Sequence, residues 1–125
     1  MSFKILVVDD CAVMRKVIEK TIHICGLDCG SIFEASNGEE GLSILSENEI
    51  DLLLIDINMP VMDGMKMLRE VRERDYVKDF PVLIVSAESN EERIEEVNRQ
   101  GAVFIHKPFT PEKLRGKLLD LIENR

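Results

Sequence analysis

This sequence has few cysteines and no long hydrophobic run, and its 24 acidic residues outnumber its 16 lysines and arginines. The cysteines are Cys11, Cys25 and Cys29. An odd number of them, in a chain without a recognisable signal peptide, argues against a disulfide framework. No apolar run reaches the length that would span a bilayer. The formal net charge of −8 disfavours nucleic acid as a partner because its phosphates would be repelled. We expect a cytoplasmic protein with no direct nucleic-acid contact and no membrane insertion.

A zinc site and a second domain are also disfavoured. His23 lies close in sequence to Cys25 and Cys29, but a fourth ligand is missing and the spacing is not that of a usual zinc site. The chain has no linker, internal repeat or low-complexity segment. Its 125 residues, 45% hydrophobic and 32% charged, have the composition of a soluble globular protein. They predict a single domain over residues 1–125.

What is present is a regular alternation of short apolar runs with segments of helical periodicity. The runs cover residues 5–8, 31–35, 52–55, 82–85 and 103–105. They are continuous rather than alternating, which is typical of parallel strands covered on both faces. Strands that alternate with helices indicate crossover units. We predict an α/β fold, a doubly wound (βα)5 flavodoxin-like domain with a five-stranded parallel sheet of order 2-1-3-4-5.

Local signals place several helix ends and one apolar face. The first helical segment has apolar or small residues on one side, namely Met14, Val17, Ile18, Thr21, Ile22 and Cys25. Asn37-Gly38 predicts a turn. Ser89 and Glu92 have the spacing of a capping box. Thr110 predicts an N-cap because Pro111 is suited to the first helical position.

Polar side chains stand where the apolar runs end. Asp9 and Asp10 follow the first run, Asp56 follows the third, Ser86 ends the fourth, and Lys107 comes shortly after the fifth. In an open α/β sheet, ligands bind outside the carboxyl ends of the strands near the switch in strand order. The predicted order makes these four strands contiguous. Acids can also stand at strand ends simply because the chain reaches solvent there, but four contiguous ends with complementary chemistry predict one pocket.

The chemistry of this predicted pocket suits a metal-assisted transfer of phosphate. Three nearby carboxylates repel one another, and a hard divalent cation such as Mg²⁺ with oxygen ligands relieves that repulsion. A carboxylate can attack phosphorus and form an aspartyl phosphate, and Asp56 is the central acid. Lys107 would neutralise charge on the transferring oxygens and Ser86 would donate to one of them.

Two other activities use the same fold class. A flavodoxin-like cofactor binder needs a loop rich in Ser, Thr or Gly after the first strand to donate N–H groups to phosphate. Here Asp9 and Asp10 would repel phosphate unless a metal intervened. A phosphatase of the haloacid dehalogenase type needs a second acid two residues after the nucleophile. Asn58 holds that place, and an amide cannot shuttle a proton.

Four motifs, in this order, resemble the receiver domain of two-component response regulators. They are ILVVDD at residues 5–10, LLLIDINMPVMDG at 52–64, VLIVSA at 82–87 and HKPF at 106–109. Each motif alone is weak, but the ordered set is highly specific. VMRK at residues 13–16 and KPFTPEKL at 107–114 are most similar to single-domain chemotaxis regulators of the CheY type.

The resemblance implies a role for each residue that matches the family pattern. Asp56 resembles the phosphoacceptor, Asp10 a direct Mg²⁺ ligand, and Asp9 an acid that acts on the metal mainly through water. Asn58 is similar to the residue that offers its backbone carbonyl to the metal. Lys107 resembles the lysine that pairs with the phosphoryl group.

The remaining matches concern conformational change. Ser86 and Phe104 resemble the switch hydroxyl and the switch aromatic, and the Lys107–Pro108 bond would be cis. Phe104 has no hydroxyl, unlike the tyrosine of many members. Cys11 replaces a residue that is often polar, which we interpret as a tolerated small side chain. We interpret His106 as a flanking residue rather than a second phosphate site.

The family implies a switch rather than an enzyme acting on a separate substrate. Such domains take phosphate from a sensor histidine kinase or a histidine phosphotransfer protein and later hydrolyse it themselves. Asn58 and Glu88 are placed to flank the attacking water, which predicts a short-lived phosphoryl group. The downstream protein target is expected on the face of the fourth helix, the fifth strand and the fifth helix. The alternatives are a phosphorelay intermediate, a fragment of a longer transcriptional regulator, and a metal-binding pseudo-receiver.

Overall fold

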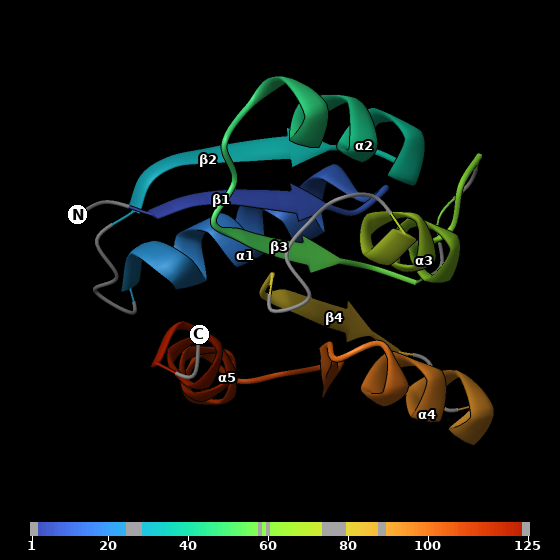
Figure 1. The fold of residues 1–125 in the computed structure, drawn as a ribbon. Helices are drawn as coiled ribbons and strands as arrows, with labels where there is room; N and C mark the ends of the chain where they lie inside the picture. Colours follow the sequence, from blue (N-terminus) through green and yellow to red (C-terminus); the bar gives the residue numbers. More distant parts are fainter. Residues whose placement is uncertain are drawn as a thin grey trace.

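The computed structural model describes residues 3–24, 29–57, 59, 61–73, 80–87 and 90–123. Strands and helices alternate along the chain (Figure 1). The strands are β1 (Phe3–Val8), β2 (Cys29–Ala35), β3 (Leu52–Ile55), β4 (Val82–Ser86) and β5 (Val103–His106). The helices are α1 (Ala12–Ile24), α2 (Gly38–Glu47), α3 (Gly64–Glu73), α4 (Glu91–Arg99) and α5 (Pro111–Glu123).

The sheet has the predicted topology. Its five strands are parallel and follow the order β2-β1-β3-β4-β5, and Figure 1 shows the arrows of β1 to β4 pointing the same way. Val8 pairs with Ile55, and Ile55 pairs with Ile84. The carboxyl ends of β1, β3 and β4 therefore lie level with one another. The residues that follow these strands are brought to a common edge.

Helices cover both faces of the sheet and define two hydrophobic clusters. Successive side chains of a strand point to opposite faces, so Ile5 and Leu6 of β1 belong to different clusters. One cluster lies under α2, α3 and α4 and includes Leu6 and Ile84. The other lies under α1 and α5 and includes Ile5 and Leu118. Burial on both faces explains why β3 is apolar throughout and why β4 is apolar up to Ser86, its last residue.

One predicted turn and one predicted helix start need correction. Asn37-Gly38 is not a turn between elements. Asn37 is the N-cap of α2, where its side chain accepts a hydrogen bond from the Glu40 N–H. Asn90 caps α4 and accepts from the N–H groups of the second and third helical residues, whereas Ser89 of the predicted capping box lies outside the described residues. Asparagine is among the strongest N-cap residues, which explains both starts. The predicted cap at Thr110 is confirmed, since its hydroxyl accepts from the Lys113 N–H at 3.2 Å.

The predicted apolar face of α1 is partly wrong. Ile18, Thr21 and Ile22 are buried, whereas the Val17 side chain is 45% exposed. Cys25 lies outside the described residues, and Cys11 is a free, exposed thiol. Within the described part of the chain, the helices are too short or too polar to cross a membrane.

Candidate functional site

The three predicted acids converge at the carboxyl ends of β1 and β3. One carboxylate oxygen each from Asp9, Asp10 and Asp56 lies within 4.8 Å of those of the other two. Asp9 is 2% exposed and Asp56 is 7% exposed, whereas Asp10 is exposed to solvent. Two largely buried carboxylates so close together need compensating positive charge or strong hydrogen bonds.

Every polar group of Asp9 has a partner in the protein. Its N–H donates to the Ala35 carbonyl at 3.1 Å, which extends the pairing of β1 with β2 by one residue. Its carbonyl accepts from Arg15 at 2.6 Å. Its Oδ1 accepts from the Cys11 N–H at 2.9 Å, and its Oδ2 accepts from Lys107 at 3.1 Å. Asp9 is thus fixed on all sides.

Lys107 brings the positive charge that the carboxylates require. Its ammonium lies 3.1 Å from Oδ2 of Asp9 and 3.6 Å from Oδ2 of Asp56, and its side chain is 18% exposed. The backbone also fixes Lys107, because its N–H donates to the Ser86 carbonyl at 2.9 Å. The predicted cis bond between Lys107 and Pro108 is confirmed. One cation therefore contacts the two buried acids.

Asp56 is held by its backbone from two directions. Its N–H donates to the Val8 carbonyl at 2.9 Å, which aligns it with the end of β1. On the other side Gly64 packs directly against it, so closely that an added Cβ would lie 2.2 Å from the Asp56 carbonyl oxygen. The Gly64 N–H donates to the Ile57 carbonyl at 2.9 Å. Only glycine permits this approach of α3 to the end of β3.

The two predicted switch residues lie on one face of the sheet. Ser86 is fully buried at the end of β4. Ile84 pairs with Phe104, and Ser86 pairs with His106. Since side chains alternate along a strand, Ser86 and Phe104 are diagonal neighbours facing the α2, α3 and α4 layer. The half-buried Phe104 ring packs against that cluster and contacts the His106 ring edge-on, with centroids 4.7 Å apart. His106 thus touches Phe104, the predicted switch aromatic.

The structure adds two residues to the predicted site and leaves two predicted residues outside its described part. Asn58 and Glu88 lie outside the described residues, so their roles stay predictions. Arg15 and Gly64 were not predicted as site residues. Asp63-Gly64 is a recognisable turn signal, but no local pattern indicates that Arg15 bonds the Asp9 carbonyl. That contact exists only because α1 packs beside the end of β1.

The donor set fits a hard divalent cation. The clustered ligand atoms are carboxylate oxygens, and no His nitrogen or Cys sulfur joins such a cluster in the part of the chain that the structure describes. Oxygen donors favour Mg²⁺, which usually binds few protein carboxylates and keeps several waters. Asp10 is exposed and its face is open to such a hydrated ion. The Asp9 oxygens already bind an N–H group and an ammonium.

Known proteins share the sequence pattern and the fold of this chain. The response regulator receiver domain family matches residues 5–119. This chain belongs to that family. A chemotaxis protein CheY homolog of Campylobacter jejuni is 36% identical over 95% of this chain and 92% of its own length. The receiver domain is thus of the CheY type, and the family is one of two-component phosphoacceptor switches.

Solved structures of similar chains agree with the assignment. CheY4 of Vibrio cholerae superposes with a TM-score of 0.84 at 30% identity, covering 97% of this receiver domain and 99% of CheY4. CheY in a CheX–CheY–BeF3–Mg complex from Borrelia burgdorferi has a TM-score of 0.83 at 28% identity, covering 96% and 89% of the two chains. The fold and strand order predicted from sequence are confirmed.

Proposed function

We propose that this receiver domain accepts a phosphoryl group on Asp56 in a Mg²⁺-dependent reaction and thereby changes the surface that a downstream protein recognises. The observation that carries the proposal is the clustering of Asp9, Asp10 and Asp56, with Lys107 in contact with Asp9 and Asp56. The names of the CheY relatives support chemotaxis as the pathway. The free Cys11 thiol supports a reducing compartment, the cytoplasm.

The transfer step uses the Asp56 carboxylate as nucleophile. Its oxygen forms a bond to phosphorus while the bond from phosphorus to the phosphohistidine nitrogen breaks, and the histidine leaves with that electron pair. When bound, Mg²⁺ would neutralise charge on the phosphoryl oxygens, with Asp10 as a direct ligand and Asp9 acting through water. Lys107 lies 3.6 Å from Asp56 and exchanges its bond to Asp9 for one to the new phosphate.

The donor is a sensor histidine kinase or a histidine phosphotransfer protein. The first turns of α1 support such docking, because Val13 is 72% exposed and Val17 is 45% exposed one turn further on. These side chains follow Asp9 and Asp10 closely in the chain and offer a partner protein an apolar contact surface beside the acids. A small phosphodonor would need no such surface.

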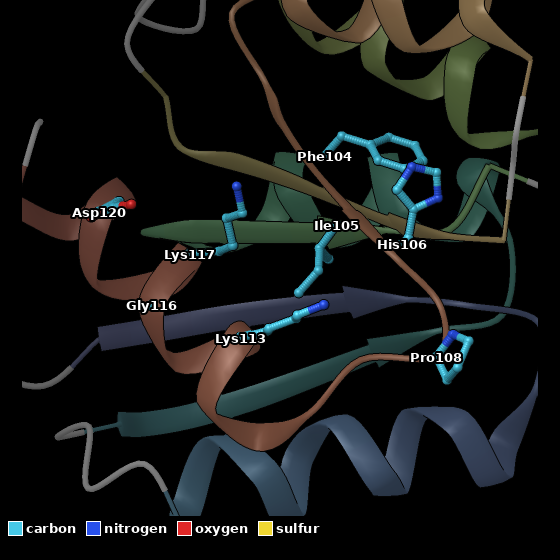
Figure 2. A pocket seen from close by; sticks show the side chains of 8 residues that line it. All are labelled: Phe104, Ile105, His106, Pro108, Lys113, Gly116, Lys117 and Asp120. Carbon is cyan, nitrogen blue, oxygen red and sulfur yellow. The ribbon is translucent and has the colours of Figure 1, made fainter.

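The output surface lies on α4, β5 and α5. A groove of about 440 Å³ runs between β5 and α5. Figure 2 shows the rings of Phe104 and His106 together, with Lys113 and Lys117 reaching from α5. Phosphate on Asp56 adds acceptor oxygens that draw Ser86 toward them, and Phe104 then turns into the vacated space. An aromatic ring has discrete rotamers, so a small shift becomes a two-state change, and phosphorylation biases an equilibrium already present.

The domain also hydrolyses its own phosphoryl group. We assign the control of the attacking water to Asn58 and Glu88, which are small or polar enough to orient it. Replacing them with Met and Lys should slow dephosphorylation, measured as loss of the phosphoryl group after the donor is removed. Equal lifetimes in the double variant and wild type would remove these residues from the mechanism.

Labelling with acetyl phosphate tests the acceptor. Wild-type protein with Mg²⁺ should gain one phosphoryl group that is labile at alkaline pH, detected as a mass increase of the intact chain. Asp56→Asn should not be labelled, and a chelator should prevent labelling of the wild type. Full labelling of Asp56→Asn, or equal labelling in chelator, would contradict the proposal.

Thermal unfolding tests the metal. Mg²⁺ should raise the melting temperature of the wild type because it binds the folded state and relieves repulsion among the acids. In Asp10→Ala this increment should shrink, while the metal-free variant gains stability from the missing charge. An unchanged increment in Asp10→Ala would exclude Asp10 as a ligand.

A further inference from the structure

Arg15 joins α1 to both strands at the β2 side of the acid cluster. Its Nε donates to Oε1 of Glu34 at 2.9 Å, and its NH1 group donates to the Asp9 carbonyl at 2.6 Å. The Arg15 side chain is 17% exposed and that of Glu34 is 28% exposed. The guanidinium is therefore enclosed between the end of β1 and the end of β2.

The bond to the Asp9 carbonyl fixes more than one atom. The carbonyl of Asp9 and the nitrogen of Asp10 belong to one planar peptide group, so a hydrogen bond at the oxygen fixes the rotation of the whole plane. That plane decides the direction in which the Asp10 side chain leaves the backbone. Because Asp10 is exposed, its side-chain direction is not set by packing against neighbouring side chains.

Glu34 anchors the guanidinium from the other side. The hydrogen bond from Lys16, assisted by that from Arg15, holds the pKa of the Glu34 carboxyl below its ordinary value. Glu34 thus stays ionised and binds Arg15 at neutral pH. Arginine has several donors in a rigid fork, which lets Nε and NH1 reach different acceptors at once. A lysine at position 15 would have one nitrogen for both tasks.

We propose that Arg15 is a positioning residue for the metal site: its guanidinium, anchored on Glu34, holds the Asp9–Asp10 peptide so that the Asp10 carboxylate faces the cation. The inference rests on the proposed Mg²⁺ dependence. Arg15 acts through the backbone and contacts neither the cation nor the phosphate.

The sign of a mutational effect separates this role from simple electrostatics. Arg15 is a cation close to a cation site, so its removal by Coulomb's law alone would tighten Mg²⁺ binding. Loss of positioning has the opposite effect, and partners outside the ligand shell typically change metal affinity by about tenfold or more. Arg15→Met should therefore bind Mg²⁺ about tenfold more weakly than wild type.

Three further variants isolate the contact. Lys16→Met is the matched charge control, because Lys16 also binds Glu34, at 3.0 Å, from the next position of α1. It should leave Mg²⁺ affinity within about twofold, the effect of one exposed charge. Arg15→Lys keeps the charge but not the fork and should weaken binding. Glu34→Gln removes the charged anchor and should weaken it less than Arg15→Met.

The measurement is a Mg²⁺ titration of the unphosphorylated full chain under native conditions. Binding is monitored through changes in the amide chemical shifts. Affinity measured on folded protein does not depend on global stability, so a purely structural role for Arg15 would leave it unchanged. Unchanged or tighter binding by Arg15→Met, or equal weakening by Lys16→Met, overturns the inference while the proposed function stands. If the wild type fails to bind Mg²⁺, both the proposed Mg²⁺ dependence and this inference are overturned.

Discussion

The ammonium of Lys107 lies 3.1 Å from Oδ2 of Asp9, a residue 98 positions away in the chain. In the metal-free protein this ion pair compensates the buried acids at the carboxyl ends of β1 and β3. The same lysine contacts Asp56 at 3.6 Å. In the proposed mechanism this lysine therefore competes with Mg²⁺ for the carboxylate oxygens and moves to a phosphate on Asp56.

Lys107→Met tests this opposition. Metal-free stability should fall by about 2 kcal/mol because two buried carboxylates lose their cation. Mg²⁺ should then stabilise the variant more than wild type, since no ammonium competes for the oxygens. The comparison is the melting temperature with and without Mg²⁺. Lys113→Met on α5 serves as control, and equal Mg²⁺ increments in all three proteins would contradict the competition.

Gly64→Ala should be severely destabilising. A Cβ at this position would lie 2.2 Å from the Asp56 carbonyl oxygen, so α3 or the segment after β3 must shift. We expect a loss of about 3 kcal/mol or more in the free energy of unfolding, at the upper end for overpacking. Denaturant titration measures it. Wild-type stability in this variant would show that α3 moves freely relative to Asp56.

Gly116→Ala should have opposite effects on stability and on recognition. Gly116 lines the groove between β5 and α5, and an added Cβ there meets nothing within 4 Å. Alanine should stabilise the helix by about 1 kcal/mol while it narrows the groove.

The measurement for Gly116→Ala is a pull-down. The partner is defined as the protein that binds wild type treated with beryllofluoride and does not bind untreated wild type. Its retention by Gly116→Ala should be weakened although the variant melts at a higher temperature. Full retention by the more stable variant would place the docking surface elsewhere.

Ser86→Ala should separate phosphorylation from its surface response. The variant keeps Asp56 and should still accept phosphate, but it lacks the hydroxyl that we propose moves toward the new oxygens. Its chemical-shift changes over α4 and over residues after Pro111, on addition of beryllofluoride and Mg²⁺, should be smaller than those of wild type. Ser86→Thr keeps a hydroxyl and should respond normally. Wild-type shifts in Ser86→Ala, or one Phe104 rotamer in both states, would refute the link.

The ion pair between Arg69 of α3 and Glu96 of α4 should make stability depend on pH. The hydrogen bond from Arg69 holds the pKa of the Glu96 carboxyl below its ordinary value. The folded state therefore favours ionised Glu96. This contribution is present above the unfolded pKa and is lost as the pH falls through the lower folded pKa. It should amount to less than about 1 kcal/mol because the pair is partly exposed.

Glu96→Gln checks that pH dependence. Relative to wild type it should be less stable at pH 7 and approach wild-type stability in acid, measured by denaturant titration at several pH values. Glu95→Gln is the control, since Glu95 contacts Arg99 at 3.8 Å with both side chains largely exposed. A constant difference between wild type and Glu96→Gln at every pH would contradict the assignment.

The parts that sequence could not predict depend on choices between neighbouring residues or on contacts across the fold. Val17 has the periodicity of a buried position, but α1 is covered on one side only and its apolar arc is narrower than the pattern suggests. Ser89 and Asn90 are both residue types that cap helices well, so local sequence does not choose between them, and in the structure Asn90 is the cap of α4. Nothing near Arg15 in sequence indicates that it meets Glu34, which lies 19 positions away.

The sequence by itself determined the strands, their order and the identity of the acids at their ends. Continuous apolar runs suit strands buried on both faces, and parallel strands bring their carboxyl ends to one edge, so the pattern along the chain already predicts a cluster. Tertiary structure alone decided how the cluster is held. The bond from Arg15 to the Asp9 carbonyl, the approach of Gly64 to Asp56 and the reach of Lys107 to Asp9 depend on distances between packed elements. Those distances are set when helices pack on the sheet, and local periodicity does not encode them.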